Sequence, residues 1–206
     1  MLRENAKVMR NKFEVTGLFY QQGNYKCRKY LDIKRADSNQ KFPDVMVVMM
    51  NPGSSYPLDK IDNNTVASDA VPDKTQDQIM RVMDNSNFDY ARILNLSDLR
   101  TPKSKDLYEF IKSSESKTFP HSIFDGKRRE ELKSLFVQGV PVIYGWGVNK
   151  ALEPLAKSAV EAINCPDPVG LKKAETLYFY YHPLPQVYND QIEWVKVVTE
   201  QLKKRT

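Results

Sequence analysis

Cysteine and histidine are scarce in this sequence of 206 residues, which contains two of each. Cys27 and Cys165 are too few for a four-cysteine zinc or iron–sulfur site within this chain alone, and His121 and His182 leave few options for a zinc enzyme. So little cysteine is typical of a reducing compartment, and we expect a cytoplasmic protein.

Long apolar stretches and several familiar motifs are also missing. No run of about 18 apolar residues is present, so we expect no membrane-spanning helix. The charged start, MLRENAKVMRNKFEV, has no apolar core, so we expect no secretory signal. No Walker loop, G-x-G-x-x-G, C-x-x-C or G-x-S-x-G motif occurs, and none of the activities that these motifs mark is indicated.

The composition is that of an ordinary soluble domain. Apolar residues make up 41% of the chain, which is enough for a core, and charged residues 28%. We expect residues 1–206 to form a single domain and a monomer. The net charge of +5 is compatible with an anionic partner such as DNA but does not demonstrate one.

The order of the apolar segments predicts alternating strands and helices. Residues 13–20 and 25–34 are rich in aromatic and β-branched side chains and predict a hairpin. Continuous apolar runs predict buried strands at 45–50, 90–96, 140–144 and 176–181. Helices are predicted from a cap at Thr75 or Asp77 to about Met83, over 104–113, over 126–136, and from a cap at Asn149 to about 163. A last helix is predicted over 189–203, with Ile192, Val195, Val198 and Leu202 on one side.

The predicted fold class is therefore α/β. We expect a three-layer α/β/α sandwich with a mostly parallel central sheet, to which the N-terminal hairpin adds an antiparallel edge. In such sheets the ligand lies beyond the carboxyl ends of the strands. This rule selects four loops, which are 51–55 (NPGSS), 95–97, 145–147 and 182–185 (HPLP).

Each loop has both a functional and a purely structural interpretation. Asn51 is suited to hold a water or a polar ligand group, and Ser54 and Ser55 to contact phosphate, but Asn-Pro-Gly is also ordinary turn sequence. Asn95 ends an apolar strand, where its amide either pairs with a nucleobase edge or ties down neighbouring loops.

The other two loops also have a functional and a structural interpretation. His182 either donates a hydrogen bond to a developing anion or phosphate or is a satisfied structural histidine. The Gly145–Gly147 turn leads into a helix N-terminus, which favours phosphate, or is a tight turn with a packed tryptophan. His121 lies in the polar stretch TFPHS, and we expect it at the surface or at a helix cap.

Taken in order, the four loops resemble the uracil-DNA glycosylase superfamily. VVMMNPGSS is similar to the first motif of its mismatch-specific branch, ARILNLSDLR to the strand whose Asn contacts the base, VPVIYGWGVNKAL to the strand that ends in Gly, and YYHPLPQ to the last motif. The layout over roughly residues 25–203 resembles more closely a bacterial and phage family known as domain of unknown function 1643.

The glycosylase resemblance implies a site and an activity. The enzyme would flip a mispaired, damaged or modified base out of DNA, including phage-type modified bases, and hydrolyse its N-glycosidic bond without metal or other cofactor. Asn51 would hold the attacking water, and His182 would stabilise charge on the leaving base. Substrate binding would use Pro52, Gly53, Ser54, Tyr56, Asn95 and Gly145, with Tyr56 stacked on the base. DNA contacts would come from Ser55, Pro183, Leu184, Pro185 and Gln186, with Leu184 or Gln186 as a wedge.

The sequence also departs from the superfamily pattern. Met49 replaces the glycine that begins the first motif, HPLP replaces HPSP, and Asn51 in place of Asp provides no strong general base. Two alternatives therefore stand beside the glycosylase. One is a module that binds a nucleotide or modified base without catalysis, and the other is a hydrolase of free nucleosides or nucleotides.

Overall fold

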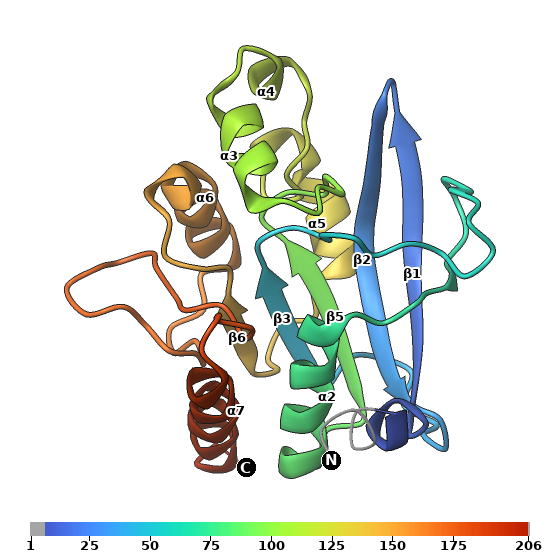
Figure 1. Ribbon diagram of the computed structural model, residues 1–206, viewed down its shortest axis with the longest axis vertical. Helices are drawn as coiled ribbons and strands as arrows, with labels where there is room; N and C mark the ends of the chain where they lie inside the picture. Colours follow the sequence, from blue (N-terminus) through green and yellow to red (C-terminus); the bar gives the residue numbers. More distant parts are fainter. Residues whose placement is uncertain (1–6, 206) are drawn as a thin grey trace.

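The protein contains one six-stranded mixed sheet with helices packed against it (Figure 1). The computed structural model describes residues 7–205. The strand order is β4-β1-β2-β5-β3-β6. The strands are β1 (Phe13–Gln22), β2 (Tyr25–Arg35), β3 (Val45–Met49), β4 (Ser68–Asp69), β5 (Tyr90–Asn95) and β6 (Val142–Gly145). The predicted hairpin and three of the four predicted buried strands are confirmed.

The prediction of a mostly parallel sheet is wrong. Only β5, β3 and β6 run parallel, whereas β2 pairs antiparallel with β5, β1 with β2, and β4 with β1. The cause is the position of the hairpin. Its long strands pair directly with the parallel strands through β2 and so make up much of the sheet.

The predicted strand at 176–181 is also wrong, because another segment takes its place. Val169 lies beside β6, where its N–H donates to the Val142 carbonyl (2.8 Å) and its carbonyl accepts from the Tyr144 N–H (2.8 Å). Tyr180 is left with isolated bridges to Gly147 and Lys172. The run TLYFYY is therefore not a strand of the sheet, and within it Phe179 and Tyr180 are buried whereas Leu177 and Tyr181 are exposed.

Alternate residues of β3 belong to two separate core clusters. Val45, Val47 and Met49 pack with α2 (Lys74–Ser86) and α7 (Tyr188–Lys203). Met46 and Val48 pack with the opposite cluster. That cluster includes residues of α3 (Ser104–Lys112), α5 (Arg129–Leu135) and α6 (Glu153–Ile163). Further short helices are α4 (Glu115–Thr118), η1 (Gly126–Arg128) and η2 (Lys150–Leu152).

The predicted helices are confirmed, but one residue of α7 is not buried as predicted. Asn149 caps η2 by accepting the N–H of Ala151 (2.9 Å), and α6 then begins at Glu153. In α7 Val195, Val198 and Leu202 are buried as expected, but Ile192 is 51% exposed and does not share their contacts. Within residues 7–205 no helix is both long enough and apolar enough to cross a bilayer.

Candidate functional site

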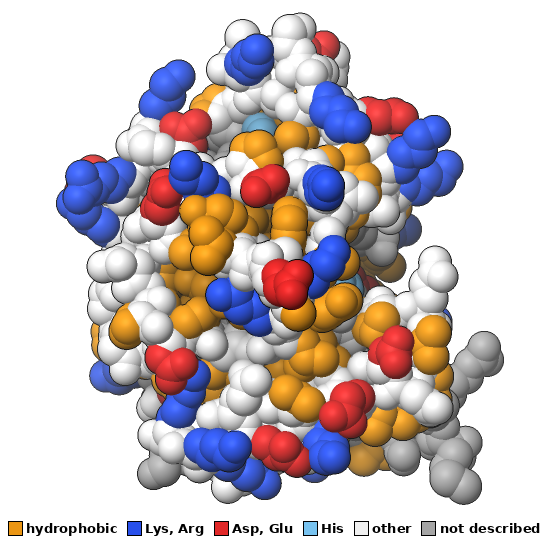
Figure 2. Space-filling model, turned by 90° about the vertical axis from the view of Figure 1, so that its left-hand side faces the viewer, with side chains coloured by type: hydrophobic (Ala, Val, Ile, Leu, Met, Phe, Trp, Pro, Cys, Tyr) orange, Lys and Arg blue, Asp and Glu red, His pale blue; other side chains and the backbone are white. Residues whose placement is uncertain are grey.

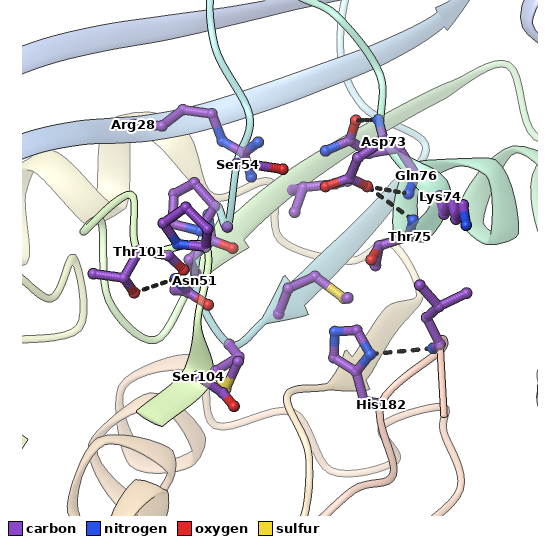
Figure 3. Close-up of a pocket in the computed structure, with 18 of the residues that line it drawn as sticks. Arg28, Asn51, Ser54, Asp73, Lys74, Thr75, Gln76, Thr101, Ser104 and His182 are labelled. Carbon is purple, nitrogen blue, oxygen red and sulfur yellow. Dashed lines mark hydrogen bonds between the residues drawn. The ribbon is translucent and has the colours of Figure 1, made fainter. Parts of the chain in front are cut away.

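A cavity of about 550 Å³ lies at the carboxyl ends of β3 and β5, next to the start of α2 (Figure 3). Asn51, Asn95 and His182, which come from three of the four predicted loops, all line it. Asn51 follows β3, Asn95 is the last residue of β5, and His182 arrives from the loop before α7. The strand-end rule therefore locates this cavity.

Asn51 is held by the chain that follows β5. Its Nδ2 donates to the Leu99 carbonyl (3.2 Å), the Thr101 carbonyl (2.9 Å) and the Thr101 hydroxyl (2.8 Å). An aspartate at this position would place a carboxylate against two carbonyl oxygens. The amide thus ties two loops of the cavity wall together, and this contact accounts for Asn rather than Asp.

Asn95 is completely buried, and neither its Nδ2 nor its Oδ1 has a hydrogen-bond partner among the described residues. The alternative in which this amide ties down neighbouring loops is therefore not what the structure shows. A buried amide without partners destabilises a fold by about 1–3 kcal/mol. One donor and one acceptor side by side at the wall of a cavity are suited to a ligand that presents the complementary pair.

His182 is held in one tautomer. The Leu184 N–H donates to its Nδ1 (3.1 Å), so Nδ1 accepts and the proton of the neutral ring is on Nε2. Burial lowers the pKa of His182, and the negative charge of Asp73 opposes this effect. At neutral pH the side chain is therefore an uncharged N–H donor at the cavity.

Asp73 is a carboxylate that the sequence analysis missed, and the predicted cap of α2 at Thr75 or Asp77 is wrong. It caps α2, because its Oδ1 accepts the N–H groups of Thr75 (2.8 Å) and Gln76 (3.0 Å), and Gln76 Oε1 accepts the Asp73 N–H (2.7 Å). The spacing of Asp73 and Gln76 before an apolar helical face is a capping-box signal that the sequence contains. The cap fixes a negative charge at the cavity wall, and Figure 3 shows Asp73 beside the start of α2, with Thr75 between it and His182.

Two substitutions separate the cap from the charge of Asp73. Asp73→Ala should lower the free energy of unfolding by about 1 kcal/mol, because the helix loses its cap. Asp73→Asn keeps an oxygen acceptor and should leave stability nearly unchanged, while the pKa of His182 falls further because the opposing charge is gone. Urea unfolding and an NMR titration of the imidazole measure the two effects. An equal loss of stability in both variants would contradict the capping role.

Arg28 is the second residue that sequence reasoning missed, and a β-bulge directs it to the cavity. Tyr30 and Arg28 face consecutive residues of β1, which leaves Lys29 as an extra residue in β2. Lys29 pairs with Glu131 of α5, and Tyr30 packs in the cluster on that face. The bulge therefore turns Arg28 to the opposite face, where it lines the cavity. Periodicity alone could not locate this reversal.

The remaining predicted site residues divide into two groups. Pro52, Gly53, Ser54 and Leu184 line the cavity, whereas Ser55, Tyr56, Gly145, Pro183, Pro185 and Gln186 are not part of its lining. Tyr56 is 40% exposed, so it does not supply a stacking aromatic in this arrangement, and the described lining contains no Phe, Tyr or Trp. Gly145 packs against Pro183, whose Cδ would be 3.2 Å from an added Cβ.

The expectation that His121 is at the surface or at a cap is wrong. It is 5% exposed, and its Nδ1 lies 2.8 Å from Ser97 Oγ. Burial lowers its pKa to about 4. The polar letters around it misled the prediction, because aromatic side chains such as Phe110, whose ring centroid is 5.0 Å away, enclose the ring.

Comparison with known proteins assigns the chain to a family but gives it no activity. No curated protein matches the sequence. A family model described as "Protein of unknown function (DUF1643)" matches residues 30–184. That range includes β3, β5 and β6 and every loop of the cavity up to Leu184. The chain therefore belongs to the DUF1643 family.

Proposed function

We propose that this protein is a DNA glycosylase-like enzyme, which hydrolyses the N-glycosidic bond of a mispaired, damaged or modified base flipped into the cavity. The observation that carries the proposal is the buried, unpartnered amide of Asn95 in a cavity that it shares with His182. A base edge presents adjacent donors and acceptors that such an amide can satisfy. The resemblance to the uracil-DNA glycosylase superfamily, including its three-layer arrangement, belongs to this proposal.

The chemistry divides among three side chains of the cavity. Asn95 holds the base edge. As the glycosidic bond breaks, negative charge develops on the base, and the Nε2–H of His182 donates to it. Positive charge develops on the sugar, and the carboxylate of Asp73 stabilises it and orients the attacking water, a role the superfamily resemblance assigns to Asn51. No step requires a metal ion or a cofactor.

DNA would approach over the loop that follows His182. Leu184 lines the cavity, and Gln186, Val187 and Tyr188 beyond it are exposed, the last two by 58% and 46%. Such side chains are suited to enter the space that a flipped nucleotide leaves. On the side of α6 and α7, lysines and arginines are interspersed with acidic side chains rather than gathered in one strip (Figure 2). We therefore assign recognition to the cavity and this loop, in a monomer. The two free thiols fit a cytoplasmic setting.

The substitution Asn95→Leu tests the proposal. Leucine has a similar shape and removes two buried polar atoms without partners, so the free energy of unfolding should stay the same or rise by about 1 kcal/mol. Base release should fall at least about 100-fold, because the base loses its hydrogen bonds. The assay measures alkali-labile abasic sites in labelled oligonucleotides that contain uracil, a G·T mismatch, deaminated purines, or hydroxymethylated or glucosylated cytosine.

Two outcomes would count against the enzyme. If folded wild-type protein cleaves none of these substrates, the glycosylase proposal fails. A binding module without turnover is then favoured by the contacts of Asn51 and Asp73, whose polar atoms are partly engaged with the chain itself. If Asn95→Leu is as active as the wild type, Asn95 does not hold the base.

A further inference from the structure

A buried guanidinium without partners lies in the same cavity. Arg28 is 2% exposed, and its Nε and Nη1 make no hydrogen bond within residues 7–205. It forms no ion pair with any described residue. Burying a charge in this way is unfavourable unless a partner arrives. An isolated domain gains nothing from it, so the side chain is explained by a ligand.

The neighbouring charges do not neutralise Arg28. Asp98 is engaged by Arg128, and Asp73 Oδ1 by the start of α2. Burial lowers the pKa of Arg28 to about 10, and the charges of Asp73 and Asp98 oppose this effect, so the group is a cation at neutral pH. Its missing partner is therefore an anion.

Arg28 differs from the other cations that line the cavity. Arg10 makes two hydrogen bonds to the carboxylate of Asp77 (2.6 and 2.8 Å), and Lys74 is exposed to solvent. The planar fork of an arginine matches two oxygens of a phosphate, which a lysine ammonium does not. The bulge at Lys29 gives this fork its direction, so the arrangement depends on the backbone of β2 as well as on the side chain.

We propose that Arg28 binds the phosphate of the nucleotide whose base is held by Asn95. Both side chains come from the adjacent strands β2 and β5 and line one cavity of about 550 Å³, a volume suited to a ligand of nucleotide size. In Figure 3 Arg28 enters from the hairpin side and His182 from the opposite side, so a ligand can span the space between them. The proposal rests on the proposed function only for the position of the base.

The test compares ligands that differ in one phosphate. Deoxynucleoside 5′-monophosphates and the corresponding deoxynucleosides are titrated into the full chain by calorimetry, with inorganic phosphate and a single-stranded oligonucleotide as further probes. The best monophosphate should bind at least about tenfold more tightly than its nucleoside. The oligonucleotide distinguishes the two sources of phosphate. Competition with the monophosphate indicates a strand, and its absence indicates a free nucleotide.

Two variants make the result specific to Arg28. Arg28→Met keeps the length of the side chain, removes the unpaired charge and should abolish the preference for the phosphate without lowering the unfolding midpoint in urea. Arg28→Lys keeps the charge without the fork and should retain only part of the preference; it also serves if the methionine variant does not fold. Absence of nucleotide binding by the wild type, equal affinity for nucleotide and nucleoside, or an unchanged preference in both variants would overturn the proposal.

The outcome is separable from that of the proposed function. Binding that depends on Arg28, without abasic sites in any oligonucleotide, would support the phosphate site and reject the glycosylase. If the protein releases bases and the KM of Arg28→Met equals that of the wild type, the glycosylase is supported and the phosphate site is rejected.

Discussion

Replacing His182 with asparagine should slow base release by the proposed glycosylase about 100- to 1000-fold, because in that proposal the cavity loses the donor to the leaving base. The asparagine oxygen takes the position of Nδ1 and still accepts the N–H of Leu184, so the loop before α7 keeps its contact. Stability in urea should therefore hardly change. The measurement is single-turnover release of the base from the best substrate of the oligonucleotide panel.

A second substitution keeps a donor near the position of Nε2 and loses the acceptor at the position of Nδ1. His182→Gln places an amide N–H near the position of Nε2 and gives up the contact with Leu184, so it should recover part of the lost rate at some cost in stability. If the asparagine and glutamine variants are equally slow, the Nε2–H is not the group that matters. A rate within about threefold of the wild type for the asparagine variant would remove His182 from the mechanism.

The pH dependence of the same rate follows from the pKa of His182. Burial lowers that pKa below its ordinary value of 6.5, so most of the rings stay neutral as the pH falls from 8 to 6.5. The rate should fall by less than about twofold over this interval and more steeply only at a lower pH, where the ring gains a second proton and Nδ1 can no longer accept from Leu184. A rate that rises on acidification through 6.5 would instead indicate a cationic histidine.

The largest loss of stability is expected from Arg128→Met, about 3–5 kcal/mol. Arg128 Nη1 donates to Asp98 Oδ2 (2.6 Å), which also accepts from the Tyr20 hydroxyl (2.8 Å), and the Asp98 side chain is fully buried. The substitution leaves this carboxylate without its cation. The exposed neighbour provides the control, because Arg129→Met should change the free energy of unfolding by less than about 0.5 kcal/mol.

The loss should also depend on pH. Burial raises the pKa of Asp98 to about 6, and the charge of Arg128 opposes that rise, so the pKa is higher still in Arg128→Met. A folded-state pKa above the unfolded value means that the native state binds the extra proton, and stability is lost as the pH rises through the folded pKa. Urea unfolding should therefore show a smaller defect at pH 5 than at pH 8. A defect below 1 kcal/mol at pH 8 would contradict the role of this pair.

The contacts of Asp98 with Tyr20 and Arg128 matter for the cavity because Asp98 lies in the chain that follows β5. Asp98 is three residues beyond Asn95 and one before Leu99, whose carbonyl accepts from Asn51. Its ties to Tyr20 of β1 and to Arg128 of η1 hold this chain between the hairpin and α5. The positions of Asn51 and Asn95 at the cavity thus depend on a buried ion pair that contacts neither of them.

Local sequence patterns determined most elements of this protein and predicted seven of the residues that line its cavity, which are Asn51, Pro52, Gly53, Ser54, Asn95, His182 and Leu184. The apolar runs of β3, β5 and β6 are bounded by residues that end strands, so their identity follows from short-range chemistry. Because parallel strands bring their carboxyl ends to one edge, Asn51 and Asn95 converge whatever the details of packing. His182 was found in the same way, although the strand predicted before it does not form.

Long-range contacts decided what the sequence left open. The hairpin pairs with β5 and Val169 takes the outer edge beside β6, and neither choice is visible in a local window because both depend on which backbone groups meet across the fold. The same holds for Arg28, since a single extra residue in β2 reverses the face to which it points. Asp73 and Arg28 line the cavity only because the start of α2 and the bulged strand β2 come together there, and that meeting is a property of the tertiary structure alone.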